Sequence, residues 1–497
     1  MKLGKLLEGE NFRITHPDLL NQEINHWTDQ SSEVKEKSWY IAIRGISSDG
    51  HQFIQDAISR GASGLIVEEE VRHGIPQVIV PNSRHFLSLL SSRWFGKPSQ
   101  KLHLVGVTGT NGKTTTTYLI QHLLNAQTQA GLVGTVEALW KDQHVSTINT
   151  TPGARELNRL LYRMVNDGIT ACAMEVSSHA LKQERVNQIH FQTAVFTNLT
   201  QDHLDYHKTF EDYFESKARL FRDFSSVSKR IVNVDDLYGE KLWNLIKQNN
   251  SRVSYGIRQE ADYRASDIKM SLEDTRFNLS ARGKKFDVTT KLLCLHNVYN
   301  FLAAIAVVSE MGYPMKEILQ SISQFKGVPG RLERFQLPNG ALIFVDYAHS
   351  PDAFLNVYSS LKPLKRGRLI SVFGCGGNRD RQKRPEMGRI ARENSDWMMI
   401  TSDNPRQENP TEIIAEILAG IPEKSRAAVD VIADRREAIQ AALGMAKKDD
   451  WVLILGKGHE AYQIIGKEKH KFSDQEEIRR WVRSHTTPHH SKNLLGV

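Results

Sequence analysis

The chain has 497 residues, of which 40% are hydrophobic and 25% charged, values that are ordinary for a globular protein. At this length one core is not enough, so two to four domains are expected. Its three cysteines, Cys172, Cys294 and Cys375, are widely spaced and form no CxxC pair, which excludes a disulfide framework and a cysteine-rich zinc site and fits a reducing cytoplasm.

The net charge of +8 does not by itself identify a partner. The basic residues are scattered rather than gathered along one segment, so no nucleic-acid partner is expected, and a phosphate-rich small substrate accounts equally well for the excess charge. The first residues carry charges where a secretory signal needs an apolar run, and no window approaches 18 apolar residues. We therefore expect a cytoplasmic protein without membrane insertion.

The first hundred residues alternate short apolar runs with a helical stretch. Strands are predicted over 38–45, 63–69 and 77–81, with a loop and helix over 49–62 between the first two. The pattern restarts after the turn signals near residue 98, where the first domain (1–98) is expected to end.

The middle of the chain reads as a parallel sheet built from βαβ units. Strands alternating with helical stretches are typical of such sheets. A buried helix is predicted over 296–312, where apolar residues lie on all sides. The expected strands cover residues 101–109, 132–136, 170–178, 193–199 and 229–236.

A break at Gly327-Val328-Pro329-Gly330-Arg331 starts a third α/β series, so we expect a middle domain over 99–328 and a third domain over 329–497. The last residues, 486–497, are expected to form a loose tail. Strands of the third series are predicted within 342–349, 368–377, 397–403, 427–434 and 451–460.

A glycine-rich loop follows the strand that opens the middle domain. The segment Gly-Thr-Asn-Gly-Lys-Thr-Thr lies between a buried strand and a predicted helix, where backbone N–H groups can wrap a phosphate chain. Lys113 would bridge terminal phosphate oxygens, and the Thr114 hydroxyl would ligate Mg²⁺. The strict GxxxxGK[ST] pattern is not met, because Val107 stands at its first glycine. The residues predicted to bind ATP are Thr108, Gly109, Thr110, Asn111, Gly112, Lys113, Thr114 and Thr115.

Three polar residues stand near strand ends, where open α/β sheets bind ligands. Glu175 ends one predicted strand, His203 follows the next, and Lys217 lies on a predicted helix. Glu175 and His203 can each help to hold Mg²⁺ beside a nucleotide, although Mg²⁺ prefers oxygen ligands. Read singly, each residue also has a structural interpretation, as a helix cap, a loop residue or a solvated helix face.

The combination of motifs resembles a known family. TGTNGKTTT, NTTPGARELN, EVSSHAL, FTNLTQDHLDYH, YFESKARLF, HNVYN, PGR, DYAHSPDA, GCGGNRDRQKRP, SDNPR and GKGHE occur in that order across residues 108–460. The sequence is similar to the Mur ligases of peptidoglycan synthesis. The resemblance implies three domains: a small N-terminal α/β domain that binds a UDP substrate, a central P-loop ATPase domain with a parallel sheet, and a C-terminal Rossmann-like α/β domain that binds an amino acid.

The resemblance also implies a reaction. ATP would phosphorylate a D-glutamyl carboxylate, and an incoming amine would displace phosphate from the acyl phosphate, as in an ATP-dependent acid–amino-acid ligase. Thr114, Glu175 and His203 would hold Mg²⁺, together with Lys217 as an N6-carboxylated lysine whose anion suits a site beside the metal. Asn300 would lie on the adenine side. Arg331, Asp346 and His349 would close on the nucleotide from the third domain.

The expected acceptor is UDP-N-acetylmuramoyl-L-alanyl-D-glutamate. The N-terminal domain matches less well, because Gln30-Ser31-Ser32 stands where the family usually has an Asp-Ser-Arg triplet. Ser31 could still hold the uracil, but the departure leaves open a related ligase with a different acceptor. The acceptor-binding residues implied by the resemblance are Ser31, Asn149, Thr150, Thr151, Ser177, Gln183 and Arg185.

The expected amino acid is meso-diaminopimelate, because the family's DNPR sequence accompanies that substrate. Diaminopimelate carries a second carboxylate that lysine lacks, and Arg406 with Arg379 could hold it through paired charge-assisted hydrogen bonds. An isolated DNPR could equally be a capped turn before a helix. The residues implied in this site are Arg379, Asp403, Asn404, Pro405, Arg406, Gly456 and Glu460.

Two further interpretations stay open. Folylpolyglutamate synthetases share the architecture, although EVSSHAL together with DNPR argues against them. A non-catalytic relative that only binds nucleotide would have no need of Lys113, Glu175, His203 and Lys217 together. A monomer is what the resemblance implies.

Overall fold

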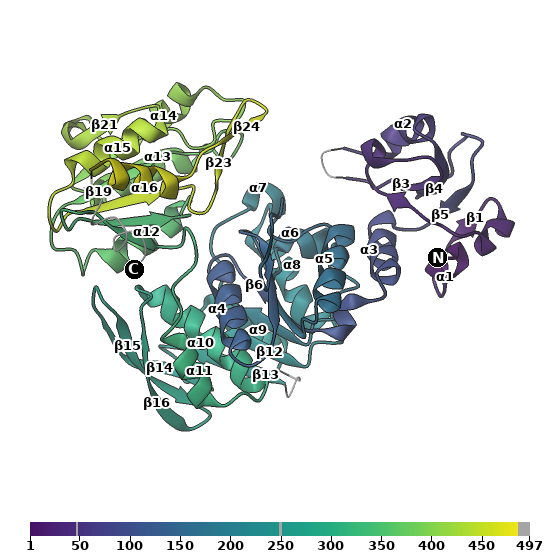
Figure 1. The fold of residues 1–497 in the computed structure, drawn as a ribbon, viewed down its shortest axis with the longest axis horizontal. Coiled ribbons are helices and arrows are strands. Elements are labelled where there is room, and N and C mark those ends of the chain that lie inside the picture. Colours follow the sequence, from purple (N-terminus) through teal and green to yellow (C-terminus); the bar gives the residue numbers. More distant parts are fainter. Residues whose placement is uncertain (46–47, 248–250, 486–497) are drawn as a thin grey trace. The chain divides into compact units, whose positions relative to one another are not determined.

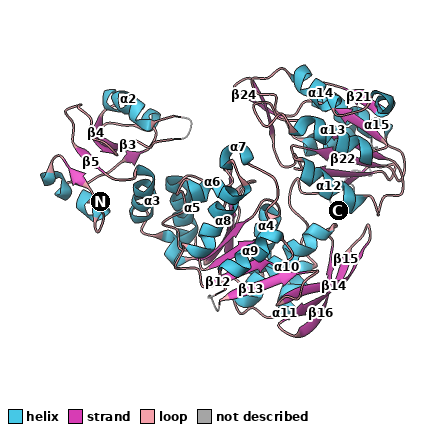
Figure 2. Cartoon of the chain, turned by 180° about the vertical axis from the view of Figure 1, so that it is seen from behind, coloured by secondary structure: helices cyan, strands magenta, loops and turns pink. Residues whose placement is uncertain are grey.

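The computed structural model describes residues 1–45, 48–247 and 251–485, and helices and strands alternate through most of that range (Figures 1 and 2). The chain divides into two units. Unit 1 comprises Met1–Thr108, Thr128–Val195 and Phe214–Arg230, and unit 2 comprises Gly109–Gln127, Phe196–Tyr213 and Ile231–Val497.

The N-terminal part of unit 1 is a five-stranded sheet with the strand order β1-β5-β4-β3-β2. Strands β2 to β5 pair in parallel, and β1 pairs antiparallel with β5. Trp39 and Ile41 of β3 belong to one apolar cluster and Tyr40 to another, because successive side chains of a strand face opposite sides. The elements are α1 (Leu3–Leu7), β1 (Arg13–Ile14), β2 (Trp27–Thr28), β3 (Ser38–Ile41), α2 (Ile54–Ser59), β4 (Ala62–Val67), β5 (Gln77–Ile79) and α3 (Ser83–Trp94).

A second sheet of unit 1 carries three parallel strands side by side. Strand β10 lies between β6 and β7 and is parallel to both, with Glu175 opposite Val107. The carboxyl ends of these strands therefore meet at one edge, while β8 and β9 extend the sheet in antiparallel fashion. The elements are β6 (His103–Thr108), β7 (Ala130–Val133), β8 (Ala138–Trp140), β9 (Gln143–Val145), α5 (Ala154–Asn166), β10 (Ala171–Glu175) and α6 (Ser178–Lys182).

Three elements contain residues of both units: β11 (Thr193–Phe196), α8 (Phe210–Arg222) and β12 (Lys229–Asn233). Unit 2 adds α4, which begins at the glycine loop, and α10, whose residues Phe301–Val308 are all fully buried. Strand β13 pairs in parallel with β14, and β14, β15 and β16 form an antiparallel meander. The bounds are α4 (Lys113–Asn125), α7 (Leu204–His207), α9 (Leu237–Leu245), β13 (Arg252–Gly256), β14 (Tyr263–Met270), β15 (Thr275–Ala281), β16 (Lys284–Thr290), α10 (Leu295–Glu310) and α11 (Met315–Ile322).

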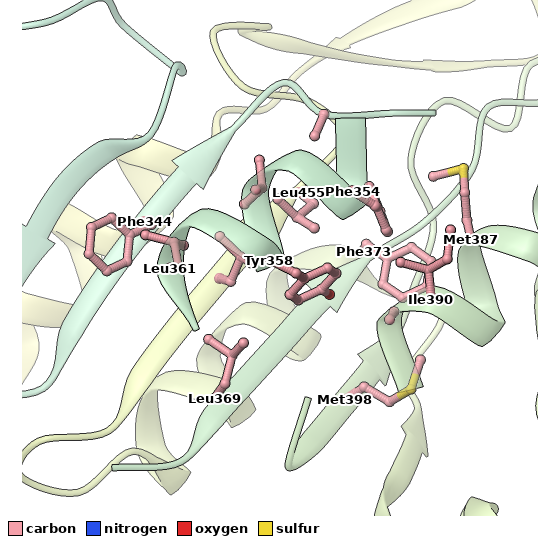
Figure 3. Close-up of a cluster of buried hydrophobic side chains, with 14 of the residues drawn as sticks. Phe344, Phe354, Tyr358, Leu361, Leu369, Phe373, Met387, Ile390, Met398 and Leu455 are labelled. Carbon is pink, nitrogen blue, oxygen red and sulfur yellow. The ribbon is translucent and has the colours of Figure 1, made fainter. Parts of the chain in front are cut away.

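The C-terminal part of unit 2 is a six-stranded sheet with the order β17-β18-β22-β19-β20-β21, parallel except for β17. One face packs against α12, α13 and α14 through the cluster drawn in Figure 3, and the other packs against α15 and α16. Strands β23 and β24 form a separate hairpin. The bounds are β17 (Glu333–Gln336), β18 (Leu342–Asp346), α12 (Pro351–Leu361), β19 (Leu369–Phe373), α13 (Lys383–Asn394), β20 (Trp397–Ile400), α14 (Pro410–Ala419), β21 (Val429–Val431), α15 (Arg435–Met445), β22 (Trp451–Leu455), β23 (Tyr462–Ile465), β24 (Glu468–Lys471) and α16 (Asp474–His485).

The predicted α/β class and the parallel sheets are confirmed, as is the buried helix, which the structure places at Leu295–Glu310. The predicted strand over 38–45 is shorter in the structure, where β3 ends at Ile41. The tail expected over 486–497 lies outside the described residues. Among the helices that the structure describes, none combines the length and the apolar character that a membrane crossing requires.

Candidate functional site

The glycine loop between β6 and α4 has a backbone that only glycine can follow. Gly109 has φ 150° and Gly112 has φ 85°. A Cβ on Gly109 would lie 1.9 Å from the Thr197 hydroxyl, and one on Gly112 would lie 2.5 Å from the Asn300 amide oxygen. The loop is therefore a cradle whose shape any larger residue would change, as a phosphate-binding loop requires.

Lys113 is the first residue of α4, and its ammonium donates to the carbonyl oxygens of Gly109 (2.9 Å) and Thr110 (2.8 Å). Thr114 is 4% exposed, and its hydroxyl accepts a hydrogen bond from the Arg331 guanidinium at 3.2 Å. Arg331 therefore contacts the start of α4, although it lies 217 residues further along the chain than Thr114. Its Nε is buried without a hydrogen-bond partner among the described residues.

Asn300 connects α10 to α4, the helix that follows this loop. The Thr116 hydroxyl donates to its amide oxygen at 3.2 Å, and its amide nitrogen donates to Asn297 at 3.1 Å. Asn111 contacts a residue that is even more distant in the sequence, because its amide donates to the Asp352 carboxylate at 3.2 Å. Segments distant in sequence thus converge on the predicted ATP-binding residues.

Asp202, which the sequence analysis passed over, stands among the predicted nucleotide and metal residues. Burial opposes its ionisation, but the charges of His203, His349 and Lys113 outweigh burial and lower the pKa of Asp202 below its ordinary value. His203 has φ 53°, and its Nε2 lies 3.5 Å from the Asp202 carboxylate. The only sequence signal for Asp202 was its place directly before His203.

Glu175 is 1% exposed at the end of β10. Its carboxylate accepts hydrogen bonds from the Thr135 backbone N–H (2.8 Å) and hydroxyl (3.0 Å). The Thr135 hydroxyl also lies 3.0 Å from that of Thr150. Thr135 follows β7, the neighbouring parallel strand, so sheet order explains why it reaches Glu175. The sequence analysis missed Thr135, whose sole signal was its position after a predicted strand.

Four of the residues predicted to bind the acceptor are linked to one another. The Thr151 hydroxyl bonds the Glu175 carbonyl (2.9 Å) and the Ser177 hydroxyl (3.3 Å). Arg185 donates to the Thr151 carbonyl at 3.0 Å and to Gln183 through two nitrogens. These contacts connect the predicted acceptor residues to Glu175. Asn149 is exposed and joins none of the contacts described.

Ser31 lies elsewhere in unit 1, at the start of a short turn, and its hydrogen bond lowers the pKa of Asp56. The neighbouring Glu33 forms an ion pair at 2.6 Å with Arg155 of α5. Arg155 also donates to Thr28 at 3.2 Å and stands over the Trp27 ring. This segment, which lacks the family's arginine, is thus contacted by an arginine from another part of the chain.

Lys217 lies on α8 and is 1% exposed. A buried ammonium is costly unless it is paired, so burial sets this residue apart from a solvated helix face. The alternative interpretation of Lys217 as part of a solvated helix face is therefore wrong.

Asp346 ends β18, and its carboxylate accepts from the backbone N–H groups of Leu332 and Ala348, both at 2.7 Å. Burial raises its pKa. The contacts fix the backbone that follows Arg331. Next to it, the Tyr347 ring lies 4.8 Å from His349 and 5.0 Å from His459.

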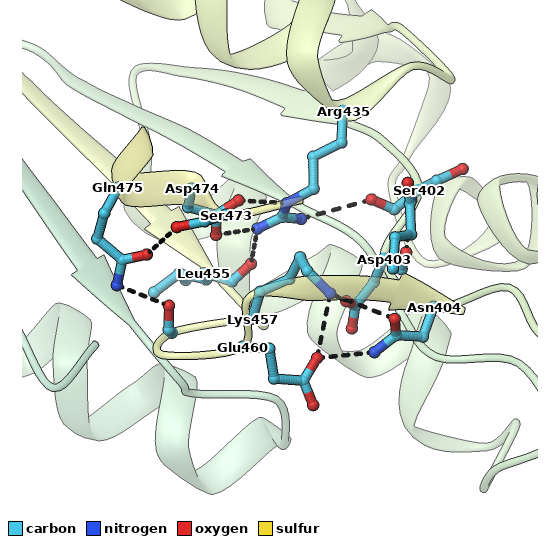
Figure 4. Close-up of polar contacts among 12 residues, drawn as sticks. Ser402, Asp403, Asn404, Arg435, Leu455, Lys457, Glu460, Ser473, Asp474 and Gln475 are labelled. Atoms are coloured by element: carbon cyan, nitrogen blue, oxygen red, sulfur yellow. Dashed lines mark hydrogen bonds and ion pairs between the residues drawn. The ribbon is translucent and has the colours of Figure 1, made fainter. Parts of the chain in front are cut away.

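The residues predicted to bind the amino acid follow the carboxyl ends of parallel strands of the C-terminal sheet, as expected for a ligand site. Strands β20 and β22 lie on either side of β19. Asp403 and Asn404 follow β20, and Gly456 and Glu460 follow β22. Figure 4 shows how the side chains of Asp403, Asn404 and Glu460 meet around the buried Lys457. Asn404 donates to Glu460 at 2.8 Å. A Cβ on Gly456 would lie 3.6 Å from the Asp403 carboxylate.

Two arginines lie beside this cluster. Burial, and after it the charge of Arg379, lowers the pKa of Arg406. Arg406 donates to the Gly377 carbonyl at 2.9 Å, while Arg379 is exposed and has no hydrogen-bond or ion-pair partner among the described residues. Two neighbouring cations of this kind suit an anionic ligand.

The fully buried Arg384 connects the loop after β19, which contains Arg379, to the loop after β20, which contains Arg406. It bonds both oxygens of Glu408 and one of Glu416 at 2.8–3.0 Å, and it donates to the Gly376 carbonyl at 3.1 Å. The backbone of Asn378 also donates to Glu408. The loops after β19 and β20 are thereby held at a fixed spacing.

No group of three or more His, Cys, Asp or Glu side chains that could hold a metal occurs within the described residues. Mg²⁺ in nucleotide enzymes takes few protein ligands and completes its shell with phosphate oxygens and waters. The Thr114 hydroxyl in unit 2 and the buried Glu175 carboxylate in unit 1 are each an oxygen ligand of the type that Mg²⁺ takes. The cradle and Lys113 fit the phosphates themselves.

The comparisons with known proteins agree with this geometry. Residues 107–308 match the model of the Mur ligase middle domain, and residues 330–458 match the model of the Mur ligase glutamate ligase domain. The chain belongs to the Mur ligase family and is an ATP-dependent ligase.

The chain is 41% identical, over 97% of its length and 99% of the relative's, to UDP-N-acetylmuramoyl-L-alanyl-D-glutamate–2,6-diaminopimelate ligase 1 of Clostridium acetobutylicum. It is 43% identical to the diaminopimelate ligase of the same name from Gloeobacter violaceus, covering 96% of this chain and 97% of that one. A solved ligase with that name superposes with a TM-score of 0.70 at 32% identity, covering 98% of this chain and 100% of the other. The predicted three-domain architecture is confirmed by these neighbours.

Proposed function

We propose that the chain joins meso-diaminopimelate to the γ-carboxylate of the D-glutamyl residue of UDP-N-acetylmuramoyl-L-alanyl-D-glutamate in peptidoglycan precursor synthesis. A carboxylate oxygen of the acceptor attacks the γ-phosphorus of ATP, and ADP leaves. The uncharged amine of diaminopimelate then attacks the acyl carbon, phosphate leaves with that oxygen, and the amine loses a proton. One amide forms for each ATP consumed.

The nucleotide is proposed to bind along the glycine loop, with Lys113 moving from the loop carbonyls to the terminal phosphate oxygens. Arg331 and His349 approach the phosphates, and Asn300 faces the adenine side. The converging contacts of Arg331 with Thr114 and of Asn111 with Asp352 support this assignment. Mg²⁺ would neutralise phosphate charge when bound. Thr114, Glu175 and His203 are the residues proposed to hold it, with Asp202 beside His203.

Lys217 is proposed to carry an N6-carboxylate. Its 1% exposure supports this, because burial removes the side chain from the solvated helix face where an unmodified ammonium is expected. Native mass spectrometry and a crystal structure of the nucleotide-bound enzyme would detect the added carboxylate. A bare amine in the active, nucleotide-bound enzyme would contradict the modification.

The acceptor is proposed to lie along Thr150, Thr151, Ser177, Gln183 and Arg185, with Asn149 beside them. The hydrogen bonds that link these residues to one another and to Glu175 support this. Ser31 is the proposed contact to the uridine end.

The observation that carries the choice of amino acid is the pair Arg406 and Arg379 beside Asp403, Asn404 and Glu460. Diaminopimelate offers a carboxylate to the two guanidinium groups and an ammonium to the carboxylates. L-Lysine would leave the guanidinium groups unpaired, which strongly disfavours it. Pro405 and Gly456 shape the backbone of this site.

The experiment offers the purified protein ATP, Mg²⁺ and the UDP acceptor, with either meso-diaminopimelate or L-lysine, and follows phosphate release and product mass. Turnover with diaminopimelate and little with lysine is expected. If neither amino acid is turned over while ATP still binds, the proposal is wrong for this acceptor. The altered triplet at Gln30-Ser31-Ser32 would then direct the search to a different acceptor.

Three broader expectations belong to this proposal. The domains are proposed to span 1–98, 99–328 and 329–497, and the enzyme is proposed to act as a monomer. A cytoplasmic location is supported by the cysteines, all three of which are free and buried.

A further inference from the structure

Lys457 is a fully buried cation at the centre of the proposed amino-acid site. It lies in the turn after β22, and its side chain is 0% exposed. Its ammonium lies 3.4 Å from Asp403, 3.2 Å from the Asn404 amide oxygen and 3.1 Å from Glu460 (Figure 4). An ammonium has three N–H donors, so each of them can face one of these acceptors.

All three partners of this ammonium are residues proposed to select the amino acid. They come from two loops, after β20 and after β22, that no sequence proximity brings together. Asn404 is fixed further, because its amide nitrogen donates to Glu460 and its oxygen accepts from the Ile464 backbone at 2.9 Å. The Lys457 ammonium contacts both carboxylates, whereas Asn404 contacts only that of Glu460.

We infer that Lys457 is a positioning residue for amino-acid specificity: its ammonium holds Asp403, Asn404 and Glu460 in the arrangement that receives the incoming amino acid. The inference rests on the proposed function for the identity of that amino acid. Buried charged groups contribute little net stability but fix geometry when each partner is hydrogen-bonded. Without the ammonium, two neighbouring carboxylates repel each other and lose their common partner.

The same ammonium also contributes to the net charge of the side chains proposed to bind the amino acid. Asp403 and Glu460 bring two negative charges, whereas Lys457, Arg379 and Arg406 bring three positive ones, so the set keeps one positive charge. Meso-diaminopimelate has two carboxylates and two ammonium groups, whereas L-lysine has two ammonium groups and only one carboxylate. A group of side chains that already contains an ammonium and keeps a positive charge therefore favours the amino acid with the second carboxylate.

The test replaces Lys457 by methionine, which has a similar unbranched shape but no charge. We expect KM for meso-diaminopimelate to rise at least about tenfold, the effect of losing a charged hydrogen-bond partner. The KM for ATP should change less than about twofold and kcat less than about threefold. The preference for diaminopimelate over L-lysine should fall. An unchanged KM for diaminopimelate, or equal losses in both KM values together with a lower melting temperature, would overturn the inference.

A double-variant cycle tests whether Lys457 acts through its partner. Lys457→Met and Glu460→Gln are measured singly and together, and the double variant should lose no more affinity for diaminopimelate than the worse single one. Additive losses would contradict the positioning role. If Lys457→Met fails to fold, Lys457→Gln replaces it, since glutamine keeps an N–H donor.

Lys448→Met, at an exposed lysine of the same domain, is the matched control. Wild-type turnover of diaminopimelate is measured first. If the wild type fails, the proposed function is wrong. If the wild type turns over and Lys457→Met keeps its KM, only this inference is wrong.

Discussion

At the scale of single residues, Arg384, Arg435 and Lys457 are fully buried cations in the described C-terminal part of the chain. Each is paired with carboxylates, and Arg435 bonds both oxygens of Asp474 at 2.8 Å. Replacing such a pair by apolar residues often costs no stability, whereas removing one partner costs several kcal/mol. Arg384 of α13 donates to the Gly376 carbonyl, and Arg435 of α15 donates to the carbonyls of Ser402 and Leu455. Together with Lys457 in the turn after β22, they fix the geometry of the loops of the proposed amino-acid site.

Arg406→Ala tests the second carboxylate directly. Because diaminopimelate would lose a charge-assisted contact that lysine never makes, kcat/KM for diaminopimelate should fall by at least about a hundredfold. Activity with L-lysine, measured in the same assay, should fall by less than about threefold. Equal losses for the two amino acids would contradict the role of Arg406.

Gly134→Ala tests the placement of Glu175. A Cβ at Gly134 would lie 2.4 Å from a Glu175 carboxylate oxygen, the end of a side chain that can shift. The fold should therefore tolerate the change while the carboxylate moves, so kcat should fall about tenfold or more and half-maximal rate should need more Mg²⁺.

The matched control is Gly444→Ala, where an added Cβ meets nothing within 4 Å. This change, one residue before the end of α15, should keep activity and raise stability by less than about 1 kcal/mol. An unchanged Mg²⁺ dependence in Gly134→Ala would show that Glu175 does not act through the metal.

At the scale of elements, one turn after β22 contributes to both proposed substrate sites. Lys457 and Glu460 join the amino-acid cluster, whereas His459 packs on Tyr347, over which the Arg331 guanidinium stands at 4.7 Å. Burial lowers the pKa of His459 to about 3, so its ring is neutral near pH 7. The backbone of Gly330 lies close to this turn, because a Cβ added at Gly330 would lie 2.1 Å from the backbone nitrogen of His459.

The contact between Arg384 and Glu408 is predicted to be sensitive to acid. The Arg384 guanidinium is the main cause that lowers the pKa of Glu408 from 4.5 to about 2. A carboxyl whose pKa is depressed in the folded state stabilises the fold above its unfolded pKa and loses that contribution as pH falls toward the folded value. Stability from Glu408 should therefore be lost between about pH 4.5 and about pH 2.

Melting curves of wild type and Glu408→Gln measure this contribution. The variant should melt at least about 2 °C lower at pH 7, and the difference should shrink as the pH falls below about 4.5. Glu423→Gln, at an exposed glutamate without an ion pair to a described residue, is the control. A difference that stays constant with pH would exclude ionisation of Glu408 as its cause.

At the scale of the whole molecule, the proposed nucleotide site is assembled from segments far apart in the chain. Asn111 bonds Asp352, and Thr114 bonds Arg331, across 241 and 217 residues. A ligand that contacts these segments binds only the folded chain and therefore stabilises it by mass action.

A non-hydrolysable ATP analogue with Mg²⁺ at about one hundred times its Kd should raise the melting temperature by about 5 °C, corresponding to about 2.7 kcal/mol. Lys113→Met should abolish the shift without lowering the melting temperature of the free protein. Lys448→Met serves as the control. A full shift in Lys113→Met would contradict the phosphate contact.

The sequence by itself predicted the α/β class, the parallel sheets, the glycine loop and the family. These features are local: a loop such as Gly109–Gly112 consists of contiguous residues, and strands carry their apolar pattern within a few positions. Sheet order then brings the strand-end residues to common edges, as Glu175 beside β7 and Asp403 beside Gly456 illustrate.

Only the tertiary structure assigned partners to Thr135, Asp202, Arg155, Arg384 and Lys457. A lysine or arginine in a sequence is compatible with a solvated surface, a salt bridge or a ligand site. Which of these it forms depends on burial and on acceptors that arrive from distant segments. Lys457 stands within a recognised motif, yet its place among Asp403, Asn404 and Glu460 follows from the packing of two loops against one sheet edge, which no local pattern encodes.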